Sequence, residues 1–195
     1  MKTRLFPLIL IAVASLSLGS CSYNKLVTTD EACNAQWAQV ENVYQRRADL
    51  IPNIVATVKG EADFEKETLT KVMEARASAT QVKIDPSNMT DEDIKRFEDA
   101  QYSFGGTISR LMSVAESYPT LQANKAFADL RVELEGSENR ISIERKKFIE
   151  AVQAYNTLRR RFPANITASL FGFSKRATFT SKPGSDTVPT VDFSK

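Results

Sequence analysis

The chain has 195 residues, of which 42% are hydrophobic and 26% are charged, a composition typical of a globular rather than a disordered protein. It contains no histidine, the commonest general base and metal ligand, and its two cysteines are too few for a disulfide framework or a cysteine-rich zinc site. Much of conventional enzyme chemistry is thereby excluded, and we expect no cofactor and no metal.

The amino terminus has the features of a lipoprotein signal peptide. Lys2 and Arg4 form a positive segment, the apolar run Leu5–Leu18 follows, and the sequence Leu-Gly-Ser-Cys ends it at Cys21. The run is short for a transmembrane helix but suits the apolar region of a signal peptide. We therefore predict removal of residues 1–20 and lipidation of Cys21, whose acyl chains would anchor the mature chain to a membrane. The alternative is an uncleaved signal anchor in which Cys21 is incidental.

The net charge of the mature chain and the residue after Cys21 indicate which partners and which cell compartment to expect. Loss of residues 1–20 removes Lys2 and Arg4 and leaves 24 basic and 24 acidic residues, a balance that argues against a nucleic-acid partner. The positive segment stays in the cytoplasm, so we expect the domain in the bacterial cell envelope, outside the inner membrane and facing the periplasm. Ser22, rather than an aspartate, follows Cys21, which in a Gram-negative cell favours sorting to the outer membrane.

Residues 21–28 are expected to form a short polar tether, after which Thr29 or Asp30 can cap a first long helix that ends near Val82. Apolar residues recur along this helix in steps of three and four, the spacing of a helix packed against partner helices. This apolar stripe consists of Trp37, Val40, Tyr44, Ile51, Ile54, Val58, Ala62, Leu69 and Val72. Pro52 interrupts the stripe without changing its phase, so we predict a kink there rather than a chain reversal.

A second helix is predicted to begin at Thr90, because threonine followed by acids at positions 91–93 is a capping sequence whose charges favour a helix amino terminus. Its apolar stripe consists of Ile94, Phe97, Gln101, Phe104, Ile108, Leu111, Ala115 and Tyr118. Gly105 and Gly106 lie in the middle, where each glycine costs roughly 1 kcal/mol relative to alanine. We therefore expect the close approach of a neighbouring helix, or a local bend, at this pair.

Pro119 suits the first turn of a third helix, and Phe162-Pro163 ends it. Its apolar stripe consists of Ala123, Phe127, Leu130, Leu134, Ser137, Ile141, Phe148, Val152, Tyr155 and Phe162. The three segments predict an all-α protein, an elongated antiparallel helical bundle over residues 29–163 with the first helix kinked at Pro52. A count of four helices results if the chain folds back at Pro52 and Gly136.

The last stretch, residues 164–195, differs from the bundle in composition. It contains a Pro-Gly-Ser segment at 183–185 and four aromatic residues, Phe171, Phe173, Phe179 and Phe193. The simpler interpretation is a short helical turn whose aromatic side chains cover a bundle end, followed by a loose tail. The alternative is a partner-docking or membrane-interfacial segment that uses exposed aromatic side chains as anchors.

Arg47 falls on the first apolar stripe in phase with Tyr44 and Ile51, so it must be paired, because an unpaired buried charge is costly. The candidate partners and further polar groups are Asp49, Glu138, Glu144, Asn139, Arg140 and Asn156. We expect an interhelical polar network that fixes the register of the helices. The alternative is a polar groove for an anionic ligand. Asp49 and Glu138 could imitate a metal site, but metal sites in helical bundles usually add histidine.

Two further features each have a structural and a functional interpretation. Cys33 lies in a helical pattern beside Trp37, and because no histidine can activate its thiol we expect a packed structural residue rather than a nucleophile. The cluster Arg159–Arg161 comes at a helix end, where cations complement the helix dipole. The alternative for this cluster is contact with anionic lipid headgroups.

Five sequence blocks together resemble the LemA family. They are RRADLIPN at 46–53 with Val58-Lys59, YPTLQAN at 118–124, Glu138–Ile141, Tyr155-Asn156 and Phe162-Pro163. Their combination in this order is specific, and the resemblance covers about residues 26–173. It implies an α-helical bundle that is anchored to a membrane at its amino terminus. It implies no established enzymatic activity and no catalytic residue.

The predicted function is that of a non-enzymatic envelope lipoprotein, a scaffold or adaptor that uses its helix surfaces to bind an envelope protein. The alternative is a small-molecule or lipid-binding module with a pocket between helices near Gly105-Gly106 or Pro52. A third hypothesis is an enzyme that uses aspartate, glutamate or Cys33.

Overall fold

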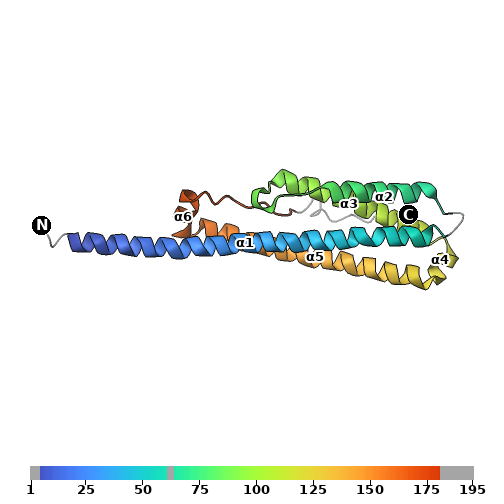
Figure 1. Ribbon diagram of the computed structural model, residues 1–195, viewed down its shortest axis with the longest axis horizontal. Coiled ribbons are helices and arrows are strands. Elements are labelled where there is room, and N and C mark those ends of the chain that lie inside the picture. The colour runs from blue at the N-terminus through green and yellow to red at the C-terminus, as the bar shows by residue number, and fades with distance from the viewer. Residues whose placement is uncertain (1–4, 61–63, 181–195) are drawn as a thin grey trace, which may run out of the picture.

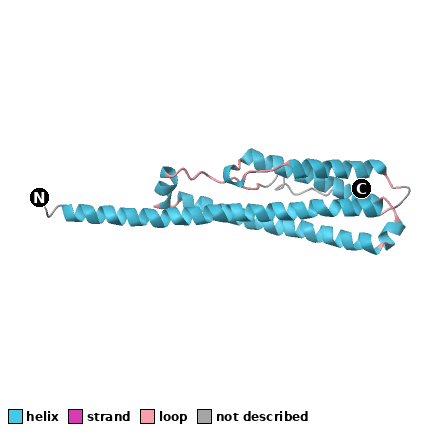
Figure 2. Cartoon of the chain, viewed as in Figure 1, coloured by secondary structure: helices cyan, strands magenta, loops and turns pink. Residues whose placement is uncertain are grey.

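The computed structural model describes the backbone of residues 5–60 and 64–180 and the side chains of residues 21–60 and 64–180. The side chains of the predicted signal peptide, the Pro-Gly-Ser segment and Phe193 lie outside the described residues. Within the described chain, helices alternate with turns and loops and no strand occurs (Figure 2). The all-α fold class is therefore as expected.

Four long helices build the described part of the chain. They are α1 (Leu5–Val58), α2 (Lys66–Gln81), α3 (Asp91–Ala115) and α5 (Lys125–Arg160). Shorter elements connect or follow them, namely η2 (Pro86–Asn88), α4 (Pro119–Ala123) and α6 (Ala164–Leu170). In Figure 1, α1 and α5 lie side by side and run in opposite directions, and α2 and α3 form a hairpin beside them.

The expectation of a single helix over residues 29–82, kinked at Pro52, is wrong. Pro52 lies inside α1, which continues to Val58, and α2 begins separately at Lys66. The end of α1 tightens at Gly60, whose amide donates to the carbonyl oxygen three residues earlier at 3.3 Å. The apolar spacing keeps its phase across this break, so periodicity does not reveal it, whereas a glycine typically follows a helix end.

Residues 21–28, expected to be a polar tether, belong to α1 instead. The hydroxyls of Thr28 and Thr29 donate to the carbonyl oxygens four residues before them, both at 2.9 Å, as in a continuing helix rather than a cap. Leu26 is completely buried, which gives this segment an apolar contact that favours the helix. Cys21 is therefore joined to the bundle through helical backbone.

The second predicted helix begins where the sequence indicates. Thr90 caps α3 because its hydroxyl oxygen accepts a hydrogen bond from the Asp93 amide at 3.1 Å, and the Asp93 carboxylate accepts one from the Thr90 amide at 3.1 Å. Every predicted stripe position from Ile94 to Ala115 is buried. The predicted start and stripe are thus confirmed as far as Ala115, whereas Tyr118, expected on the same stripe, lies beyond the end of α3.

The third predicted helix is divided in two. α4 ends at Ala123, and Asn124 then caps α5 by accepting a hydrogen bond from the Phe127 amide at 3.3 Å. α5 continues through Gly136, so the alternative of a fold-back at that residue is wrong. Phe162, expected on the apolar stripe, lies beyond the end of α5 and is 80% exposed.

Two apolar clusters form the core, and a buried arginine separates them. The first cluster surrounds Trp37, whose ring packs edge-on against two phenylalanines of α3 and α5 with centroid distances of 5.2 Å. The second surrounds Ile51 and includes side chains of α2. Along α1 the first cluster ends with Tyr44 and the second begins with Ala48, so Arg47, 3% exposed, lies between them.

Candidate functional site

Arg47 is the centre of a polar layer that crosses the bundle. Its guanidinium donates to the Glu138 carboxylate of α5 at 2.8 Å and to the Gln101 side-chain oxygen of α3 at 2.6 Å. The rings of Tyr44 and Phe104 each lie 5.1 Å from the guanidinium carbon. The layer joins α1, α3 and α5 at one height and so fixes their register, because sliding any helix would leave a buried charge without its partners.

A groove between α3 and α5 opens beside this layer. Its volume is about 1170 Å3, and Arg47 and Glu138 lie among its lining residues together with apolar side chains such as Ile108 and Leu134. Gly105 and Gly106 also line it. The groove corresponds in position to the predicted pocket near the glycine pair.

The glycine pair does not mark a close approach of two helices, contrary to expectation. A Cβ on Gly105 would lie 3.8 Å from the Arg47 guanidinium, and a Cβ on Gly106 would meet no atom within 4 Å. The two glycines instead contribute no side chains at their own positions in the α3 wall of the groove. Their physical effect is to keep the space beside Arg47 open.

A second polar contact explains how α1 accommodates Pro52. Proline has no amide hydrogen, so the carbonyl oxygen of Ala48, four residues earlier, lacks its helical donor. Arg76 of α2 supplies one, since its Nε donates to that oxygen at 2.7 Å. The same guanidinium lies 3.6 Å from the Asp49 carboxylate. Pro52 thereby leaves the Ala48 carbonyl oxygen free to accept the Arg76 hydrogen bond, which holds α2 against α1.

The residues predicted to form one polar network lie in several places. Asp49 pairs with Arg76 and accepts a hydrogen bond from Gln45 at 2.8 Å, so it does not join Glu138 as a carboxylate pair. Asn139 and Arg140 are exposed on α5. Their helical spacing in the sequence places them near the stripe, but each points away from the packed face.

Glu144, the third carboxylate proposed for Arg47, also has other partners. It accepts hydrogen bonds from Lys147 at 2.8 Å and from Gln36 of α1 at 2.7 Å. These two bonds, the one from Lys147 first, lower the pKa of its carboxyl group. Glu144 thus joins α5 to α1 about two turns from the polar layer.

Asn156, the remaining predicted network residue, holds the carboxyl-terminal segment instead. Gly172, at φ 74°, follows the end of α6, and residues 173–180, which we call the strap, then run back along the bundle. The Asn156 amide group makes two hydrogen bonds of 3.0 Å with the backbone of Arg176. Tyr155 donates its hydroxyl to the carbonyl oxygen of Ser174 at 2.9 Å.

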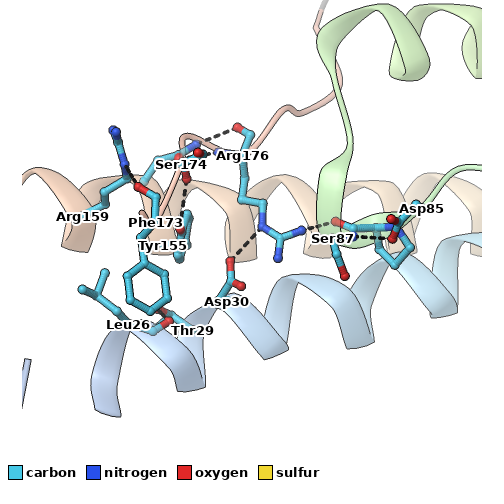
Figure 3. A network of polar contacts seen from close by, with 12 residues as sticks. Leu26, Thr29, Asp30, Asp85, Ser87, Tyr155, Arg159, Phe173, Ser174 and Arg176 are labelled. Carbon is cyan, nitrogen blue, oxygen red and sulfur yellow. Dashed lines mark hydrogen bonds and ion pairs between the residues drawn. The ribbon is translucent and has the colours of Figure 1, made fainter. Parts of the chain in front are cut away.

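Arg176 ties the strap to two further elements (Figure 3). Its Nε donates to the Asp30 carboxylate of α1 at 2.8 Å, and its guanidinium also donates to the carbonyl oxygen of Pro86 in η2. The hydrogen bond to Asp30 is the largest cause of the raised pKa of Arg176. Arg159 adds a hydrogen bond of 2.7 Å to the carbonyl oxygen of Phe173 (Figure 3).

The strap ends in the core. Phe179 is 5% exposed and lies against Phe148 and Trp37, with ring-centroid distances of 5.5 and 5.9 Å. The guanidinium carbon of Arg145 lies 3.9 Å from the centre of the Phe179 ring. The expectation that this aromatic side chain covers a bundle end is therefore wrong, because it fills the interior beside Trp37.

The sequence model of the LemA family matches residues 36–193 of this chain. The chain belongs to the LemA family. It is similar to magnetosome protein MamQ 2 of Paramagnetospirillum magneticum, 27% identical over 92% of this chain and 72% of the relative. It is also similar to magnetosome protein MamQ of Magnetospirillum gryphiswaldense, 26% identical over the same shares.

In this LemA-family protein, the blocks that carry the resemblance hold helices together. The first supplies Arg47 and the carbonyl oxygen freed by Pro52, and Asn156 holds the strap. Sequence reasoning missed what Arg76 and Arg176 do. The only signal for Arg76 is a charge within a helical pattern, and Arg176 lies in a segment without periodicity.

The two cysteines of the LemA-family chain have opposite surroundings. Cys33 is 2% exposed, and burial raises the pKa of its thiol to about 11, which disfavours the nucleophilic thiolate. Cys21 is exposed on α1. Among residues 21–60 and 64–180, no cluster of three or more metal-binding side chains occurs. Over the same residues, no helix combines the length and apolar composition needed to span a membrane.

Proposed function

We propose that this LemA-family protein is a lipoprotein of the bacterial envelope, tethered by acyl chains on Cys21, that acts as a non-enzymatic adaptor. The observation that carries the proposal is the continuity of α1 from Cys21 to Val58. A lipid on Cys21 would be attached to a helix about 57 Å long, at 1.5 Å per residue. Such a protein holds the rest of the bundle at a defined distance from its membrane.

The surroundings of the reactive side chains support a role without chemistry. Arg47, Glu138 and Asp49 are engaged in contacts between helices, and the Cys33 thiol is buried with a raised pKa. The names of the MamQ relatives assign them to the magnetosome and state no reaction. The adaptor would use the outer faces of its helices, and its partner would be another envelope protein facing the periplasm.

The anchor is tested by mass spectrometry of the protein purified from membranes of its own cell. The expected mature chain begins at Cys21 and carries acyl groups, and Cys21→Ser abolishes the acylation. A mature chain that retains residues 1–20 with a free Cys21 thiol would overturn the lipoprotein proposal.

The adaptor role is tested by photo-crosslinking from exposed apolar positions on α5. Val132 and Ile143 are 65% and 44% exposed, and a photo-reactive residue at either position is expected to give the same protein adduct in cells. Lys71, on the surface of α2, is the control position. Absence of a reproducible protein adduct across several growth conditions would count against an adaptor.

The groove between α3 and α5 supports a second candidate function, the binding of an amphipathic ligand. Its apolar side chains and the adjacent Arg47–Glu138 pair offer both apolar and polar contacts. A Cβ at position 106 meets no atom within 4 Å, so Gly106→Trp directs its ring into this open space, and Gly106→Ala is the matched control. A fluorescent fatty acid should bind the control and not the tryptophan variant; equal binding by both, or no saturable binding, would exclude this function.

A further inference from the structure

The end of the bundle that carries Cys21 exposes a group of large apolar side chains. On and around α6, Phe162 is 80%, Ile166 60%, Leu170 77% and Phe171 60% exposed. Ile166 and Leu170 are four residues apart on α6 and so share one face of the helix, and Phe162 lies in the turn before it. The opposite face of α6 is buried through small residues, Ala164, Thr167 and Ala168. The large apolar side chains of α6 are thus on its outward face, beside Asn165 and Ser169, whereas an ordinary surface helix buries them.

This apolar face lies beside the predicted anchor. Tyr23, two residues after Cys21, packs its ring edge-on against Phe171 with a centroid distance of 4.9 Å, and against Phe173 at 5.8 Å. In Figure 1, α6 lies next to α1 and runs across it, at the end of the bundle away from α4. A lipid on Cys21 would therefore hold the outer face of α6 against the membrane surface.

The exposed charges near this face are mainly cationic. Lys25, Arg160, Arg161 and Lys175 are exposed, and Glu31 is the exposed acid on the adjoining turns of α1. Asp30, the other acid there, is engaged by Arg176. Further acids, Asp85 and Asp91, flank η2, and Asp91 lines the same pocket as Lys175. Apolar side chains bordered by lysine and arginine are typical of a segment that lies in the membrane interface.

We propose that the α6 patch, defined as Tyr23, Phe162, Ile166, Leu170 and Phe171, is a second membrane contact. Its apolar side chains enter the headgroup region of the leaflet that holds the anchor, and the surrounding cations bind the phosphates of anionic lipids. This inference rests on the proposed anchor at Cys21, which brings the patch to the bilayer. Two contacts, the lipid and α6, then fix the direction in which the bundle projects, which one flexible attachment would leave free.

The test uses the full chain, processed in cells and reconstituted in vesicles of phosphatidylcholine with phosphatidylglycerol. The variant Leu170→Cys carries an environment-sensitive fluorophore, and Val132→Cys, at an exposed position in the α5 half that follows α4, is the matched control. Cys33 is buried and stays unlabelled. We expect the emission from position 170 to shift to the blue and to be quenched by spin-labelled lipids, while the emission from position 132 does neither. The double substitution Arg160→Gln with Arg161→Gln should reduce the quenching in these vesicles and leave it unchanged in phosphatidylcholine alone.

The outcomes separate this inference from the proposed anchor. If the protein fails to stay with the vesicles, the anchor at Cys21 is wrong. If the protein stays and position 170 remains as water-exposed as position 132, only the α6 contact is wrong. A blue shift at position 170 without quenching by spin-labelled lipids would also overturn it, because the patch would then be covered by protein, either a second copy or another part of this chain.

Discussion

Replacing Arg76 by methionine tests why α1 tolerates a proline. The Arg76 Nε donates to the Ala48 carbonyl oxygen at 2.7 Å, and Pro52 cannot supply that bond. A hydrogen bond from a charged donor contributes about 1.5–3 kcal/mol. The ion pair between Arg76 and Asp49, 3.6 Å apart with the Asp49 side chain 55% exposed, adds about 0–1 kcal/mol. We expect Arg76→Met to lower the free energy of unfolding by about 2–3 kcal/mol.

A double-mutant cycle with Pro52→Ala isolates the role of the carbonyl oxygen. Alanine restores an amide at position 52, which can donate to Ala48 within the helix, so Arg76→Met should cost less in this background. The expected coupling is about 1–2 kcal/mol. Urea unfolding followed by far-UV circular dichroism measures all four proteins. Arg76→Lys, which keeps the charge near Asp49, separates the ion pair from the hydrogen bond. Effects that add within about 0.3 kcal/mol would refute the reasoning.

Three further predictions concern the strap, the groove and pH. Phe179→Ala should lower the free energy of unfolding, measured with denaturant, by about 3–5 kcal/mol, because the ring is buried in the core. The control Phe171→Ala removes a 60% exposed ring and should change this free energy by no more than about 0.5 kcal/mol. Similar effects of the two substitutions would show that the strap is not packed. Gly106→Ala should raise the free energy of unfolding by about 0.5–1 kcal/mol, since the new Cβ meets no atom within 4 Å, and a lower urea midpoint would contradict an open groove. Burial raises the pKa of Cys33 from 9.0 to about 11 and that of Tyr155 from 10.0 to about 12. Both groups are thus favoured in their protonated forms by folding, so their contribution is complete below pH 9 and is lost as the pH rises through 9 to 12; a urea midpoint that is constant over this range would contradict their burial.

The elements that the sequence predicts well are those in which local and tertiary signals coincide. Thr90 and Asp93 form a complete capping box, and the apolar stripe that follows is buried at each position from Ile94 to Ala115. A cap is a local interaction between neighbours in the chain, and a stripe repeats over many turns, so both are visible without knowledge of the fold. Both signals also agree on where α3 begins.

The elements that the sequence predicts poorly depend on contacts distant in the chain. Pro52 is tolerated because Arg76 arrives from another helix, and no spacing within α1 indicates that arrival. The helix break near Gly60 is hidden because the apolar residues on either side happen to keep one phase. The strap has no periodicity at all, and its place follows from hydrogen bonds of Asn156 and from the burial of Phe179.

The candidate site was partly foreseeable for the same reason. A charge on an apolar stripe requires partners, so Arg47 and a carboxylate from another helix could be expected to meet, and Glu138 is that carboxylate. Gln101 lies on the α3 stripe but its neutral side chain gives no comparable signal. The openness of the groove beside Gly106 depends on how far apart α3 and α5 lie, which neither helix encodes alone.

The polar contacts join the end of the bundle near Cys21 to the α2–α3 hairpin. Arg176 and Asn156 connect the strap with α1, η2 and α5, and because η2 is the turn between α2 and α3, the strap also holds the hairpin. Farther along, the hairpin also meets α1 and α5 through Arg76, the Arg47 layer and the ion pair of Arg145 with Glu98. The open groove lies along α3, on the hairpin side. An occupant of that groove that displaced the hairpin would therefore also disturb the contact of η2 with the strap.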